Sequence, residues 1–160
     1  MARREPPPVP LPDAEAVAHS DRLRERIDAA IAMAGGAMDF ADYMALVLYA
    51  PGLGYYSAGQ TRFGPAGDFT TAPLVSALFS RTLAHEVSRV LSAVGGDTVL
   101  EFGAGTGQMA LDVLIELDRL GAAPRHYWIV EVSGDLRAAQ AQTLAALPAH
   151  LRGRVEWLER

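Results

Sequence analysis

Hydrophobic residues change their spacing at about residue 95 of this chain. Before that point they recur mainly every three or four positions, as on one face of a helix. After it, short continuous apolar runs alternate with amphipathic stretches of helical period. Strand, helix and strand in that order are typical of parallel strands joined by right-handed crossovers. The pattern therefore predicts an α/β fold whose parallel sheet lies in the second part of the chain.

Residues that cap or interrupt helices set the expected bounds of the helices and strands. Ser20 is a suitable N-cap for the first helix, and the proline at Pro73 suits the first turn of a later, longer one. Helices are predicted at residues 20–34, 39–50, 73–94, 108–120 and 135–147, and strands at residues 98–102, 127–132 and 155–158. Residues 52–73 are rich in glycine and aromatic residues, and a loop of this length in a compact domain usually has a function.

Composition excludes several classes of protein. Half of the residues are hydrophobic and 21% are charged, which is typical of a globular domain. Because there is no cysteine, a disulfide scaffold and a thiolate metal site are excluded, and no metal site is predicted. The 14 basic residues, all arginine, are scattered among 19 acidic ones, so nucleic-acid binding is not expected. No apolar run reaches the length that a membrane span requires.

Proline content marks the start of the chain as a separate segment. Five of the ten prolines lie in residues 1–12, without the apolar core of a secretory signal. We therefore expect a disordered leader at 1–19, a helical and loop region at 20–94 and a cofactor-binding domain at 95–160. A bacterial-type cytoplasm is the expected location, with the mitochondrial matrix left open by the arginines of the leader. The sequence does not indicate an oligomeric state.

The segment after the first predicted strand is the candidate ligand site. Gly103, Ala104, Gly105 and Gly107 join this strand to a helix. Such a turn lets a ligand approach bare backbone and directs the unpaired amide groups of the helix toward it. A small, extended ligand is therefore expected at the glycines.

Two nucleotide-type ligands compete for this loop. Gly105, Gly107 and Ala110 fit the G-x-G-x-x-A form of the dinucleotide fingerprint, which would indicate an NAD-binding oxidoreductase. Glu101 opposes this interpretation, because a carboxylate at the strand end would repel a pyrophosphate. It would attract S-adenosyl-L-methionine, which carries an ammonium group and a sulfonium.

A second carboxylate is expected at the same edge of the sheet. Glu131 closes the second predicted strand, with Val132 beside it. Because the carboxyl ends of neighbouring parallel strands line one crevice, Glu101 and Glu131 should face a shared ligand. A carboxylate at this place suits the two hydroxyls of a ribose.

These residues resemble the first two motifs of the Rossmann-like S-adenosyl-L-methionine-dependent methyltransferases. A narrower resemblance, to the MidA family of methyltransferases, lies upstream in LYAPGLGYYS and FGPAGDFTTAPLVSALF. Together the similar segments run from about Asp39 to Val132. The resemblance implies methyl transfer from S-adenosyl-L-methionine, with a protein arginine as the acceptor and respiratory complex I assembly as the process that mitochondrial members assist.

The resemblance also implies a role for residues upstream of the glycines, and it indicates how much of the complete fold the chain contains. The GDFTTAP stretch is expected to form a wall of the cofactor pocket, with Asp68, Thr70 and Thr71 available for hydrogen bonds, although Thr71 is equally suited to cap the next helix. A complete sheet of this class has seven strands, and only the first three are predicted here. The acceptor site is then expected to be absent, and no catalytic residue is assigned. A non-catalytic assembly or interaction module with the same fold remains an alternative.

Overall fold

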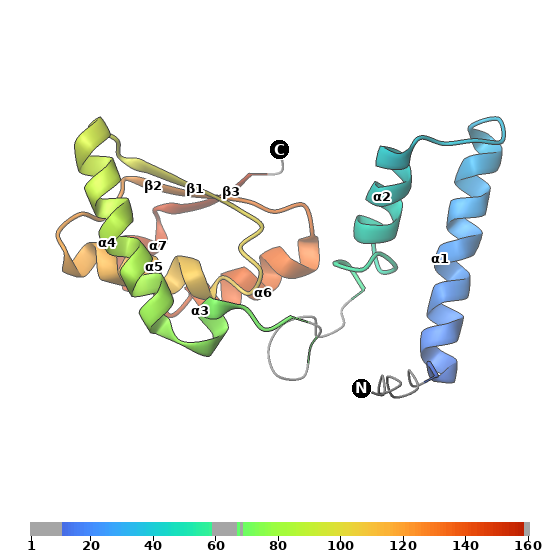
Figure 1. Ribbon diagram of the computed structural model, residues 1–160, viewed down its shortest axis with the longest axis horizontal. Helices are drawn as coiled ribbons and strands as arrows, with labels where there is room; N and C mark the ends of the chain where they lie inside the picture. The colour runs from blue at the N-terminus through green and yellow to red at the C-terminus, as the bar shows by residue number, and fades with distance from the viewer. Residues whose placement is uncertain (1–10, 59–66, 68, 159–160) are drawn as a thin grey trace, which may run out of the picture. The chain divides into compact units, whose positions relative to one another are not determined.

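The computed structural model describes residues 11–58, 67 and 69–158. The chain forms two compact units, Met1–Tyr55 and Tyr56–Arg160 (Figure 1). The boundary between the two units thus differs from the one expected at residue 95, because the helices at residues 72–94 belong to the same unit as the sheet. None of the described helices is long and apolar enough to span a membrane.

The first unit contains two helices, α1 (Ala14–Met33) and α2 (Phe40–Tyr49). Asp13 caps α1 by accepting a hydrogen bond from the backbone N–H of Ala16 at 2.8 Å, and Asp39 caps α2 in the same way. The prediction that a leader runs to residue 19 and that Ser20 starts the first helix is thus wrong for residues 14–19, since Asp13 provides an earlier cap. Residues 1–10 of the predicted leader lie outside the described residues.

The second unit is built on three parallel strands in the order β1-β2-β3. They are β1 (Thr98–Phe102), β2 (His126–Val130) and β3 (Val155–Leu158). Helix α5 (Gln108–Arg119) connects β1 to β2, and α6 (Gly134–Leu144) with the short α7 (Ala149–Arg152) connects β2 to β3. The predicted parallel sheet and its crossover helices are confirmed.

The helix predicted at 73–94 is interrupted. Ser76 has an extended backbone, with φ −158° and ψ 134°, and separates α3 (Ala72–Val75) from α4 (Ala77–Val94). The Ser76 hydroxyl accepts a hydrogen bond from the N–H of Leu78 and so caps α4. The proline pattern located the first turn correctly, but it did not show that a serine three residues later begins a new helix.

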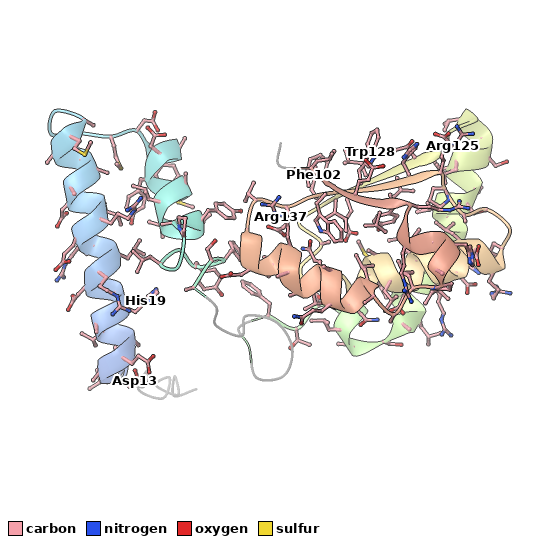
Figure 2. The ribbon with its side chains drawn as sticks, turned by 180° about the vertical axis from the view of Figure 1, so that it is seen from behind. Asp13, His19, Phe102, Arg125, Trp128 and Arg137 are labelled. Atoms are coloured by element: carbon pink, nitrogen blue, oxygen red, sulfur yellow. The ribbon has the colours of Figure 1, made fainter. Side chains whose placement is uncertain are left out.

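Within the described part of the chain, the buried core covers one face of the sheet. Tyr127 and Ile129 of β2 are buried in one apolar cluster with Ala84 of α4 and with Leu114 and Leu117 of α5. On the opposite face Phe102 is 74% exposed, and Figure 2 shows Phe102 and Trp128 on the side turned away from α5 and α6. Among the described residues, the helices that pack on the sheet therefore lie on the face that carries Tyr127 and Ile129.

Leu114→Ala tests this core. We expect it to lower the free energy of unfolding by about 2–5 kcal/mol, because a fully buried leucine leaves a cavity when it is truncated. The matched control is Ile115→Ala, the next residue of α5, which is 41% exposed and should cost less than about 1 kcal/mol. Urea unfolding followed by circular dichroism measures both, and equal losses would contradict the assigned core face of α5.

Candidate functional site

The loop between β1 and α5 needs glycine at three positions. Gly103, Gly105 and Gly107 have φ values of 64°, 56° and 81°, which residues with a Cβ rarely adopt. Gly103 N–H donates to the carbonyl of Val130 at 3.0 Å, so the loop leaves β1 while still paired to β2. A Cβ on Gly107 would lie 3.2 Å from Cα of Gln140, which shows how closely α6 approaches this loop. The conformation of the loop therefore depends on glycine at these three positions.

A cavity of about 320 Å³ lies against the loop. Five residues expected at the site line it: Thr71, Glu101, Gly103, Ala104 and Gly105. The remaining described lining residues are Ala72, Pro73 and Leu74 of α3, Phe79 of α4, and Thr106, Gln108 and Met109. The structure thus brings the TTAP segment beside the glycine loop, and mostly apolar side chains form the facing wall.

Other predicted site residues lie elsewhere. Among the described residues, Thr70, Gly107, Glu131 and Val132 are outside the lining of this cavity. Thr71 occupies the N-cap position of α3, but its side chain makes no cap hydrogen bond. Asp68 lies outside the described residues.

Glu101 is a carboxylate removed from water at the edge of the cavity. Its side chain is 8% exposed, and the hydroxyl of Tyr127 donates a hydrogen bond to Glu101 Oε2 at 2.7 Å. Burial raises the pKa of Glu101, and the hydrogen bond from Tyr127 opposes this increase. Burial and the nearby negative charge raise the pKa of Tyr127 strongly, so its hydroxyl stays protonated and remains a donor.

Glu131 has a different environment from the one expected. Its Oε1 accepts the backbone N–H of Ser133 at 2.9 Å, and its Oε2 accepts Nε2 of Gln140 at 3.1 Å. Gln140 Nε2 also donates to the carbonyl of Gly105, and its Oε1 accepts the indole N–H of Trp157 at 2.8 Å. Gln140, which is fully buried, therefore links the glycine loop to the ends of β2 and β3.

Sequence analysis missed Tyr127 and Gln140, which hold the two glutamates, and it did not assign Leu74, Phe79, Thr106, Gln108 and Met109 to the cavity lining. For Tyr127 a signal existed in the strand pattern. Tyr127 and Ile129 lie on one face of β2, and Ile129 is in register with Glu101 on β1. A tyrosine buried on that face needs a partner for its hydroxyl. Gln140 gives no such signal, because its partners come from the loop, β2 and β3, at unrelated sequence spacings.

Comparisons with known proteins show similarity to methyltransferases. Residues 82–160 match a family model described as "Putative S-adenosyl-L-methionine-dependent methyltransferase". The chain is 34% identical over 142 residues to the mitochondrial protein arginine methyltransferase NDUFAF7 homolog of Drosophila melanogaster, an alignment that covers 85% of this chain and 32% of that protein. It is also 34% identical over 116 residues to human mitochondrial protein arginine methyltransferase NDUFAF7, covering 68% of this chain and 26% of the human protein.

A solved structure gives the three-dimensional comparison. A protein from Burkholderia thailandensis, crystallised with S-adenosyl-homocysteine bound, superposes with a TM-score of 0.81 at 46% identity, covering 96% of this chain and 41% of that one. The α/β fold is therefore the Rossmann-like methyltransferase fold, represented here by three strands. The chain spans about a third or less of the length of the curated relatives it matches.

The buried carboxylate should make stability depend on pH. Because burial raises the pKa of Glu101, the folded state binds this proton more tightly than the unfolded state does. Its contribution to stability is therefore present at low pH and is lost as the pH rises through the folded-state pKa. Glu101→Gln does not titrate, and its amide oxygen can still accept the Tyr127 hydrogen bond.

We expect the unfolding free energy of Glu101→Gln, relative to that of the unaltered chain, to increase from pH 5 to pH 8. Urea unfolding of both proteins across this range measures the difference. A difference that is constant with pH would contradict a buried, titrating Glu101.

Proposed function

We propose that this chain, whose residues 82–160 match the model of an S-adenosyl-L-methionine-dependent methyltransferase family, forms the cofactor-binding part of a methyltransferase that acts on protein. The observation that carries this proposal is the buried Glu101 carboxylate beside the glycine loop. Glu101 is the one charged side chain among the described residues that line the cavity. Its charge is therefore available to a cationic ligand.

The lining of the cavity fits the proposed cofactor. The cofactor's ammonium group would meet Glu101, and a diphosphate at the same place would be repelled. The apolar wall of Pro73, Leu74, Phe79 and Met109 suits an adenine ring and the carbon atoms around the sulfur. When bound, S-adenosyl-L-methionine supplies a methyl group on a positively charged sulfur. The protein's contribution is to position that sulfur and to exclude competing anions.

Glu131 is proposed as the acceptor for the ribose hydroxyls, with Val132 beside it. Each carboxylate oxygen accepts one hydrogen bond from Ser133 or Gln140, and each has a second lone pair. Those two donors fix the carboxylate near the glycine loop, since Gln140 also binds the carbonyl of Gly105. Thr70 and Thr71 are proposed as neighbouring polar contacts, and Gly107 as the start of the helix that faces the ligand.

The acceptor is proposed to be an arginine side chain of a protein. Relatives at 34% identity are named protein arginine methyltransferases, which supports this choice. A link to respiratory complex I assembly rests on the resemblance to the MidA family. These relatives are named as mitochondrial, and location in a bacterial-type cytoplasm stays a prediction.

Calorimetric titration with two ligands tests the proposed cofactor. S-adenosyl-homocysteine should bind the chain, and NADH should not, because its diphosphate would approach Glu101. Binding of NADH alone would establish the dinucleotide alternative based on Gly105, Gly107 and Ala110. Binding of neither ligand to a folded sample would favour the non-catalytic interaction module.

Glu131→Ala tests the ribose assignment. The variant should weaken binding of S-adenosyl-homocysteine by about 1–3 kcal/mol, because ribose hydroxyls would lose a charged acceptor. Glu156→Ala, which removes an exposed glutamate from β3 of the same sheet, is the matched control and should leave the dissociation constant unchanged. Thermal unfolding of both variants identifies any loss of stability that arises because Ser133 and Gln140 no longer have Glu131 as an acceptor. An unaltered dissociation constant for folded Glu131→Ala would remove Glu131 from the site.

A further inference from the structure

We propose that Tyr127 is a positioning residue of the cofactor site, which holds the Glu101 carboxylate ionised and oriented for the cationic amino group of the cofactor. This inference rests on the proposed function and assigns a role to a residue that lies behind the cavity lining.

The geometry of the two side chains supports this role. The Tyr127 hydroxyl lies 2.7 Å from Glu101 Oε2, and Tyr127 is 2% exposed and Glu101 8% exposed. A hydrogen bond from a hydroxyl to a carboxylate at this distance is charge-assisted and strongly directional. Because Glu101 also lines the cavity, one carboxylate connects the core hydroxyl to the ligand space. Loss of the hydroxyl would free the carboxylate to rotate and to take up a proton.

Among the described residues, Tyr127 is the group that donates a hydrogen bond to Glu101. Burial raises the pKa of Glu101, whereas the hydrogen bond from Tyr127 lowers it. The described residues that α3, α4, the glycine loop and α5 contribute to the lining carry no ionisable side chain other than Glu101 itself. Where α4 meets α5, Glu116 pairs with His85 and Arg119. The charges of Glu116 and Arg119 therefore offset each other rather than that of Glu101.

A tyrosine that only fills the core would also be buried, so the test must follow the ionisation of Glu101. The full chain, labelled with ¹³C at the glutamate carboxyl carbon, is titrated by NMR without cofactor, and the Glu101 signal is identified by its loss in Glu101→Gln. In Tyr127→Phe the Glu101 signal should titrate at higher pH than in the unaltered chain. Tyr43→Phe, which removes a tyrosine hydroxyl in the other compact unit, is the control and should leave the titration unchanged.

A second probe preserves the packing in case Tyr127→Phe does not fold. Biosynthetic replacement of tyrosine by 3-fluorotyrosine makes the phenol a stronger donor at almost the same volume. The Glu101 signal should then titrate at lower pH. An unchanged Glu101 titration in the fluorinated chain, or in folded Tyr127→Phe, overturns the proposal.

Affinity measurements separate this inference from the proposed function. Binding of S-adenosyl-homocysteine to Tyr127→Phe should be roughly tenfold weaker at pH 6, and the difference should narrow toward pH 9 as Glu101 ionises in both proteins. In a Glu101→Gln background the same tyrosine substitution should have no further effect on affinity. If the unaltered chain binds and Tyr127→Phe is weakened equally at every pH, Tyr127 is a packing residue and the inference fails alone. If the unaltered chain does not bind at any pH, the proposed function fails and this inference fails with it.

Discussion

A carboxylate taken out of water must be compensated, and at the end of β1 the protein compensates Glu101 only in part. One neutral hydroxyl, that of Tyr127, donates to it from the adjacent strand. The described cavity lining contributes no cation. A charge kept under these conditions costs stability, and such charges cluster at functional sites. The buried glutamate is therefore the feature that links the core of the sheet to the lining of the cavity.

The glycine loop and α6 place that charge within a fixed frame. Positive φ angles at Gly103, Gly105 and Gly107 turn the chain from β1 into α5. Gln140 then connects the Gly105 carbonyl to Glu131 and, through its other amide atom, to Trp157 of β3. Because Gln140 is fully buried, all of its hydrogen-bonding atoms must be paired within the protein, which restricts the relative movement of these three segments.

The wall opposite the loop depends on the interruption at Ser76. If residues 73–94 formed one continuous helix, the chain could not change direction at Ser76. The extended Ser76 lets Pro73 and Leu74 join the cavity lining, while α4 continues along the core beside α5. Because Ser76 ends α3 and caps α4, α3 can line the cavity while α4 packs in the core.

Hydrophobic periodicity and the glycine pattern determined the main elements of the second unit. Three parallel strands, their crossovers and the placement of Glu101 beside the glycine loop follow from local preferences that act over a few residues. Those local rules misjudged the start of α1 and the break at Ser76, where short polar side chains redirect the backbone through caps. Tertiary structure alone settled the partners of the two glutamates. Tyr127 reaches Glu101 across the pairing of β1 and β2, and Gln140 joins Glu131 to Gly105 and to Trp157. Such contacts depend on how segments far apart in the sequence pack.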